Sequence, residues 1–451
     1  MARPISVIPQ PVVKPVLTRD TVPQDLVFFR PAKGINGTAP LSEIPREYED
    51  VGKNWILNRG RHETRMAVSA VGAAASDPLM HAFEYVTGGS VRIIIRFTTR
   101  SFQKYDAIAG LWIDIPGCTL TGSVYDFFSV TSFAGILSDK VTYREVLLFS
   151  NGVDGLCQFD PTDGSASQIT GEDVPSARHL TTFNGRIIAT NVTDESGHKP
   201  TRLRWSEKDD FTRWKDDDLT FIGAGFEDVT ASPGTVLDIC QATIPITDEV
   251  ALLFRSRSTW LVSVTGFVDA PFRFSLLFDE LGTESPYSLA KIPGGVIGFF
   301  RENFYTVTQS APSPIGTDIM EYLAPKITDP RQLFGSYDPF RQEYSVVVPD
   351  DGAIWRHSLR EKGWTRDVYP FTPKTVAPTH YDRTDLVIDD LVGVNPWEPR
   401  GIKIHGRTRI TRAEGYLGSG EYIEITPDRY WSWGIEAPAF DQGKPVLKRV
   451  G

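Results

Sequence analysis

The feature that most constrains the fold is a succession of short apolar strands joined by tight turns. The plainest example is a hairpin in which residues 178–183 and 186–190 flank Asn184-Gly185, a pair that supplies the two positive φ angles of a type I′ turn. Sustained helical periodicity is nearly absent from about residue 80 onward. The sequence therefore predicts an all-β protein.

Further hairpins follow at fairly regular intervals. They join residues 146–150 to 155–159, 250–255 to 259–264, 296–300 to 304–308, and 344–348 to 353–357. The first strands of successive groups fall near residues 179, 236, 287, 332 and 376, and a spacing of about 45–57 residues is typical of four-stranded propeller blades. With residues 80–170 supplying one more blade, we expect a β-propeller of about six four-stranded blades. A string of immunoglobulin-like sandwiches, the competing architecture, would require Pro- or Ser-rich linkers about every hundred residues, and the sequence lacks them.

The two ends of the chain differ from the propeller region. Residues 1–45 are rich in Pro and Gly, a composition that favours extended backbone. We therefore expect an extended N-terminal arm at residues 1–45, a propeller at 46–390, and a C-terminal extension at 391–451 as a candidate interface or tip segment. A disordered terminus is the alternative interpretation of the arm.

The C-terminal segment also differs in charge and in its tryptophans. Residues 400–451 carry nine Lys or Arg against six Asp or Glu, in a chain with a formal net charge of −10. Because aromatic side chains are enriched at protein interfaces, we assign Trp397, Trp431 and Trp433 as a candidate interface. The acidic balance of the whole chain disfavours binding of nucleic acid through a broad basic surface.

Cysteine, histidine and hydropathy patterns bear on cofactors and location. Cys118, Cys157 and Cys240 include no C-x-x-C pair, which indicates small buried side chains and argues against a disulfide framework or a zinc site. The seven histidines show no metal-ligand spacing. No apolar run reaches the ~18 residues of a membrane span. We therefore expect no cofactor, no metal and no membrane span, in a soluble protein made in a reducing cytoplasm.

One short segment bears on chemistry. The run from Ser206 to Trp214 resembles a loose version of the Asp-box turn of sialidases, although it lacks the central glycine. Since Asp boxes lock a hairpin and take no part in catalysis, the resemblance implies a structural turn formed by Ser206, Asp209 and Trp214. The paired carboxylates of a glycoside hydrolase can lie on any two strands. A propeller-type glycan-binding or glycan-degrading protein therefore stays open as the alternative, with carboxylates such as Glu280, Glu284, Asp338 and Asp385.

Four stretches between about residues 50 and 360 carry a wider resemblance. They are Asn54-Trp55 with Gly60-Arg61 and Glu63-Thr64-Arg65; the run from Leu147 to Gly155; Arg204-Trp205-Ser206 with the run from Asp209 to Trp214; and the run from Phe254 to Gly266, followed by Gly282 and the run from Phe299 to Tyr305. In this order they resemble the β-propeller tail nozzle proteins, also called tail accessory or stabilisation proteins, of short-tailed, podovirus-type bacteriophages.

The resemblance implies a structural protein and not an enzyme. Its expected state is a homo-hexameric ring below the portal and the head-to-tail adaptor ring, enclosing the channel through which double-stranded DNA leaves during ejection. Tail fibres or spikes are expected to attach to this ring, and DNA to pass without sequence-specific binding. The expected location is the tail of the virion, assembled in the host cytoplasm. The family carries no catalytic residues or cofactor to transfer to this sequence.

Overall fold

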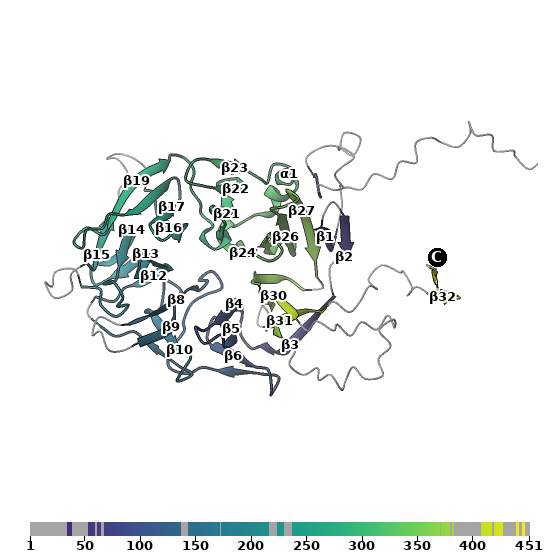
Figure 1. Ribbon diagram of the computed structural model, residues 1–451, viewed down its shortest axis with the longest axis horizontal. Helices are drawn as coiled ribbons and strands as arrows, with labels where there is room; N and C mark the ends of the chain where they lie inside the picture. The colour runs from purple at the N-terminus through teal and green to yellow at the C-terminus, as the bar shows by residue number, and fades with distance from the viewer. Residues whose placement is uncertain are drawn as a thin grey trace, which may run out of the picture.

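The computed structural model is a ring of antiparallel β-sheets arranged around a central axis (Figure 1). It describes residues 34–37, 53–58, 61–64, 67–136, 143–171, 173–215, 223–229, 237–369, 371–378, 381–382, 407–416, 419–426, 439–441 and 444–446. Six of the sheets have four strands that follow one another along the chain, which is the blade arrangement of a β-propeller. The predicted fold class, with its six four-stranded blades, is confirmed.

Each of these six blades takes one continuous segment of the chain. In chain order they contain β4 (Leu79–Val86), β5 (Arg92–Thr98), β6 (Phe102–Asp106) and β7 (Leu111–Asp114); β8 (Ser129–Ile136), β9 (Tyr143–Ser150), β10 (Cys157–Asp160) and β11 (Ser165–Gln168); β12 (Ser176–Phe183), β13 (Arg186–Asp194), β14 (Gly197–Trp205) and β15 (Gly225–Asp228); β16 (Cys240–Pro245), β17 (Val250–Arg255), β18 (Thr259–Val264) and β19 (Phe272–Phe278); β20 (Ala290–Ile292), β21 (Gly295–Phe300), β22 (Asn303–Val307) and β23 (Pro312–Pro314); and β24 (Phe334–Asp338), β25 (Glu343–Val348), β26 (Ala353–Ser358) and β27 (Gly363–Val368).

The division of the first two blades differs from the prediction. The region 80–170 was expected to form one blade, and it forms two, β4–β7 and β8–β11. The strand that begins the second of them, β8, reads SVTSFAGI and mixes Ser, Thr and Gly with its apolar residues. Because such a segment lacks the alternating or continuously apolar pattern of a strong strand, it gives little warning of a new sheet.

A seventh sheet closes the ring and is assembled from both ends of the chain. Its strand order is β28 (Pro373–Val376), β30 (Arg407–Tyr416), β31 (Ser419–Thr426) and β3 (Ala67–Ala75), with β29 (Tyr381–Asp382) also paired to β30. The antiparallel register joins Ala67 to Thr426. In Figure 1 the purple β3 and the yellow β30 and β31 lie between the first blade and the sixth.

This sheet changes the expected domain boundaries. Strands β30 and β31 fall within residues 391–451, which were assigned to a C-terminal extension, whereas their backbone pairs with β28 and β3 inside the ring. The physical reason is non-local: β3 and β28 each need a hydrogen-bonded neighbour, and the strands that supply it come from beyond residue 391.

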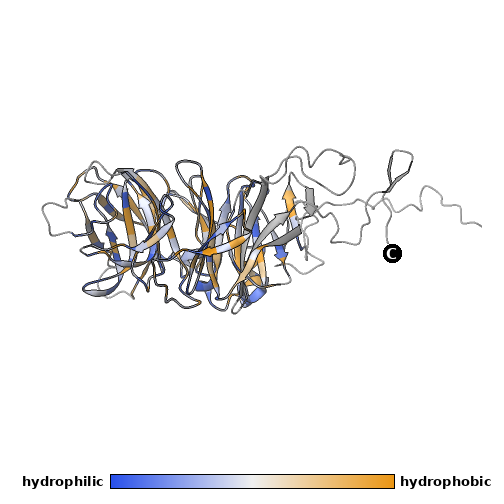
Figure 2. Cartoon of the chain, turned by 90° about the horizontal axis from the view of Figure 1, so that it is seen from below, coloured by the Kyte–Doolittle hydropathy of each residue, from blue (hydrophilic) through white to orange (hydrophobic). Residues whose placement is uncertain are grey.

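The second strand of each blade is largely buried on both faces. β21 reads GVIGFF and β25 reads EYSVVV, and every residue of both strands is buried. Such strands lose their polar face because each blade packs against a neighbour on either side. Seen from the edge, the ring is a flattened disc whose apolar residues concentrate within the strands (Figure 2).

Short segments outside the blades pack against the last blade. Ile35, in the segment expected to be an extended arm, is buried, and its amide donates to the carbonyl of Trp364. The amide of Asn54 donates to the carbonyl of Arg366, and its side-chain oxygen accepts from the amide of Val368. The remaining elements are the hairpin of β1 (Trp55–Asn58) and β2 (Arg61–Thr64), the hairpin of β32 (Ala439–Asp441) and β33 (Lys444–Val446), helix α1 (Met320–Leu323), and 3₁₀ turns at Pro286–Ser288, Ala324–Lys326, Pro330–Gln332 and Pro349–Asp351.

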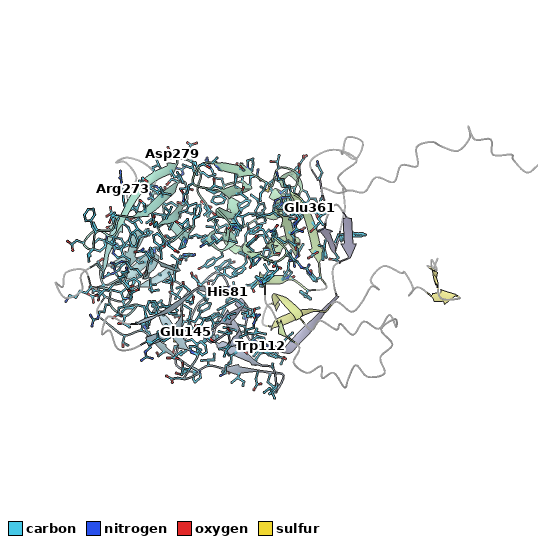
Figure 3. All side chains as sticks on the ribbon, in the orientation of Figure 1. His81, Trp112, Glu145, Arg273, Asp279 and Glu361 are labelled. Carbon is cyan, nitrogen blue, oxygen red and sulfur yellow. The ribbon has the colours of Figure 1, made fainter. Side chains whose placement is uncertain are left out.

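The centre of the ring is filled by aromatic side chains, which we call the axial plug: His81, Phe127, Tyr287 and Phe334. The Phe127 ring lies 5.2 Å from that of Tyr287 and 5.5 Å from that of Phe334, and His81 packs at 4.9 Å on the edge of Phe334. Figure 3 places His81 near the middle of the disc. The four residues come from four different blades or the connections before them, so the plug ties distant parts of the ring together.

Candidate binding pocket on the propeller axis

A pocket of about 850 Å³ lies next to the axial plug. It is at the end of the propeller axis where the first strand of each blade begins. Tyr287 belongs to both the plug and the pocket wall, so the plug forms the floor. The Tyr287 hydroxyl lies 2.8 Å from the carbonyl oxygen of Phe127 and 3.0 Å from that of Arg178, which fixes the floor to two other parts of the ring. The lining residues are Tyr125, Arg178, Asn191, His198, Pro200, Leu237, Ile239, Gln241, Ser256, Arg257, Glu284, Pro286, Tyr287, Thr328, Asp329 and Arg331.

One side of the pocket carries a preformed ion pair. Arg331 Nε and Nη2 each donate to one carboxylate oxygen of Asp329 at 2.9 Å, a bidentate arrangement. The Asp329 carboxylate also accepts from the backbone amide of Arg331 and so caps the short 3₁₀ turn at Pro330–Gln332. These hydrogen bonds with Arg331 lower the pKa of Asp329, and the negative charge of Glu284 also acts on Arg331.

A second arginine lies beside the floor. Arg178 Nη2 lies 3.8 Å from Asp126 Oδ1, and the other Asp126 oxygen accepts from the amide and hydroxyl of Ser123 at 2.9 and 2.7 Å. Asp126 is therefore held in place by its own loop, and the half-exposed Arg178 is only loosely paired with it.

The third arginine is presented by a turn that a buried carboxylate organises. Asp238 accepts from the amide of Arg257 at 2.7 Å, from Ser256 Oγ at 3.1 Å and from Ser258 Oγ at 2.5 Å. The buried Arg255 lies 3.5 Å from the same carboxylate. This network fixes the backbone of the turn between β17 and β18 and leaves the Arg257 side chain exposed. Within the described part of the chain, the Arg257 guanidinium forms no ion pair.

The chemistry of the lining is therefore that of a polar recognition site. Guanidinium groups bind carboxylates or phosphates through paired N–H donors. Glu284, Gln241 and Asn191 offer hydrogen-bond acceptors, and Tyr125, which is 49% exposed, offers an aromatic face. Among the residues that the structure describes, no group of three or more His, Cys, Asp or Glu side chains could hold a metal ion.

The residues predicted for the structural turn lie together, away from the pocket. Ser206 and Trp214 are fully buried; Ser206 Oγ accepts from the amide of Ile187, and Trp214 Nε1 donates to the carbonyl of Phe211 at 2.8 Å. Asp209 adopts a positive φ of 61° and donates its amide to the carbonyl of Gly185. The carboxylate that caps the turn is that of Asp210, which accepts from the amide and hydroxyl of Thr212.

The other predicted residues are dispersed. Of the carboxylates considered for glycan chemistry, Glu284 lines the pocket, whereas the exposed Glu280 lies beside Arg301 and Asp338 accepts hydrogen bonds within the β24–β25 turn. Asp385, Trp397, Trp431 and Trp433 lie outside the described residues. The arginines of the pocket were not predicted, because three side chains from separate blades share no local spacing in the sequence.

Comparisons with known proteins bear on the fold. No protein family and no curated protein sequence matches the chain. Among solved structures, the chain is similar to the WD40 repeats of RRP9, with a TM-score of 0.46 and 8% sequence identity, over 80% of this chain and 99% of that one. No helix in the described residues is long and apolar enough to cross a membrane. By its own sheet topology, the chain is a β-propeller.

Proposed function

We propose that this protein is a structural subunit of a short phage tail, assembled in the host cytoplasm and incorporated into the virion. Six copies form a closed ring below the head-to-tail adaptor, and double-stranded DNA passes through the ring during ejection. Fibres or spikes attach to its outer side. The resemblance carried by the hairpin sequences motivates this proposal, and one feature of the propeller surface supports it.

That feature is a set of apolar turn tips on the face opposite the pocket. In a four-stranded antiparallel blade, the first and third turns lie at the same end. The β6–β7 turn exposes Ile108 completely, the β18–β19 turn exposes Phe267 at 74%, and the β24–β25 turn exposes Phe340 at 63%. We call the six exposed residues Val86, Val91, Ile108, Phe267, Val268 and Phe340 the apolar tips.

Apolar residues at such positions favour burial against another molecule. Turn tips normally carry Gly, Asn, Asp or Ser, and large exposed apolar side chains that gather on one surface mark interaction sites. Because the apolar tips come from three blades, they suit contact with a broad surface such as a neighbouring ring and not with a small ligand.

The decisive measurement is the mass of the assembled state. We expect native mass spectrometry of the protein bound to its adaptor ring, or of purified tails, to give six copies of the chain. A monomer at every stage of assembly would refute the proposed ring of six copies.

A matched pair of variants tests the apolar tips. The triple variant Ile108→Asp, Phe267→Asp and Phe340→Asp should retain the melting temperature of the parent and lose incorporation into tails. The control, Val153→Asp, changes an exposed valine in the β9–β10 turn on the pocket face and should assemble normally. Equal incorporation of both variants would show that the apolar tips are not an assembly surface.

The axial pocket favours a second function, glycan binding by a tail protein. Its size falls within the ~300–1,000 Å³ range usual for ligand pockets, and it combines charged, amide and aromatic side chains. We propose binding without cleavage, so incubation with the capsule or lipopolysaccharide of the host should release no reducing ends. Turnover that is abolished by Glu284→Gln would instead make the protein a glycan-degrading enzyme.

A further inference from the structure

The three arginines of the axial pocket differ in how far neighbouring carboxylates already pair with their guanidinium groups. Arg331 uses one donor edge, formed by Nε and Nη2, for the Asp329 carboxylate, and Arg178 lies near Asp126. Arg257 has its backbone fixed by Asp238 while its guanidinium stays exposed, without an ion pair among the described residues. The pocket therefore has one positioned guanidinium with its full donor set available, flanked by two partly neutralised ones.

The other polar groups of the pocket are mainly hydrogen-bond acceptors, which hydroxyl groups of a ligand can satisfy. Asp329 has further lone pairs beyond those that Arg331 uses, and Glu284 is an exposed carboxylate in the same wall. Gln241 adds an amide beside the Arg257 turn, and Tyr125 adds an exposed ring near Arg331. Carboxylates in a binding wall accept hydrogen bonds readily from neutral hydroxyl groups.

From this combination we infer that the axial pocket binds an acidic saccharide, in which each sugar ring carries one carboxylate among several hydroxyl groups. Arg257 binds the carboxylate, with Arg178 and Arg331 contributing positive potential, while Glu284 and Asp329 accept from the hydroxyls and Tyr125 contacts a ring face. This inference rests on the glycan-binding function proposed above and specifies its substrate class.

The same features disfavour other anions. An acidic peptide such as triglutamate matches the arginines but brings no hydroxyl groups for Glu284 and Asp329. A nucleic-acid duplex does not fit a pocket of about 850 Å³ whose floor is formed by the half-buried ring of Tyr287. A saccharide with one charge per ring satisfies both the free cation and the surplus of acceptors.

Isothermal titration calorimetry on the full chain at low salt tests the inference. The probes are trigalacturonate, the same trisaccharide with its carboxyl groups reduced to alcohols, and triglutamate. We expect trigalacturonate to bind, to bind more weakly as salt screens the charges, and to lose at least tenfold in affinity in Arg257→Gln. Arg257→Lys should lie between, because it keeps the charge and loses the paired donors. Arg273→Gln, at the outer edge of the disc (Figure 3), is the matched control and should bind like the parent.

The outcomes separate the proposals. Equal affinity for the charged and the reduced trisaccharide would overturn the acidic class and leave glycan binding standing. No binding of either trisaccharide would overturn both, without touching the structural role in the tail. Binding of triglutamate that depends on Arg257 and exceeds that of trigalacturonate would assign the pocket to an acidic peptide instead. An unchanged melting temperature in Arg257→Gln shows that any loss of affinity is local.

Discussion

Three histidines lie inside the propeller in their neutral form. Burial lowers the pKa of His81, His179 and His357 to about 4. His81 Nδ1 lies 2.9 Å from the carbonyl oxygen of Phe128, so neutral His81 donates its Nδ1 proton to that carbonyl. These side chains are therefore packing elements of the ring.

Their burial sets a pH dependence of stability. An unfolded histidine has a pKa of 6.5, so between about pH 6.5 and 4 the unfolded chain binds protons that the folded chain does not. The free energy of unfolding should be highest above this window and fall as the pH drops through it. Replacing His357 with Phe should make the fall shallower, by up to about 1.4 kcal/mol per pH unit. Urea unfolding at several pH values measures this slope, and identical slopes for parent and variant would contradict it.

Two buried thiols should be slow to react. A hydrogen bond with Cys118 and then burial raise the pKa of Cys157 far above its usual range, and burial raises the pKa of Cys240 to about 12. Since the thiolate is the reactive form, iodoacetamide at pH 8 should alkylate the half-buried Cys118 first. Peptide mass mapping over time gives the order. In guanidinium chloride all three should react, and a native Cys240 that reacts as fast as it does there would refute this assignment.

The hairpin between β12 and β13 shows what a turn sequence can specify. Asn184 and Gly185 have φ angles of 51° and 71°, as the predicted type I′ turn requires. A Cβ at Gly185 would lie 2.5 Å from Asp209 Oδ1, so the structural turn that follows β14 packs directly on this hairpin. The glycine is therefore needed for its backbone angle and also for space.

A comparison of two glycines separates these requirements. Gly197 also has a positive φ, of 96°, but a Cβ there would meet nothing within 4 Å. We expect Gly197→Ala to cost about 1–2 kcal/mol of unfolding free energy from backbone strain alone. Gly185→Ala should cost more, because the new methyl group displaces Asp209. Urea unfolding of both variants measures the two losses of unfolding free energy. Equal losses would show that the Asp209 side chain moves away from the new methyl group at no cost.

The features that could be predicted are those whose sequence pattern lies within one short stretch of the chain. Hairpins such as Asn184-Gly185 and apolar strands such as β17 and β21 carry their own pattern, so the propeller could be inferred from them. The closing sheet could not, because nothing in the sequence of β3 indicates that its partner is β31. The pocket could not either, since Arg178, Arg257 and Arg331 come together only when the blades close into a ring.

The ring as a whole depends on the sheet built from both ends. Deleting residues 407–451 removes β30 and β31 and leaves β3 and β28 without their paired neighbours. We expect the melting temperature to fall by roughly 10 °C or more, the scale for a loss of several kcal/mol, with exposure of apolar surface between the first and sixth blades. Differential scanning calorimetry and binding of a hydrophobic dye measure the two effects.

Deleting residues 1–20 is the contrasting change. This stretch has the composition of an extended arm and lacks an alternating strand pattern. We expect the melting temperature to stay within a few degrees, the scale for about 1 kcal/mol or less, while incorporation into tails is impaired. A deletion protein that unfolds would place this stretch in the ring, and one that assembles normally would show that the arm makes no joint.

The pairing of β3 with β31 also determines when the protein can finish folding during its synthesis. The ribosome makes β3 before the six blades, and its partner β31 only after all of them. Until then the nascent chain carries up to six formed blades with two uncovered sheet faces, a state open to association with other nascent chains. Closure is consequently a late, long-range event, and slow translation of the codons between β27 and β31 would prolong the vulnerable interval.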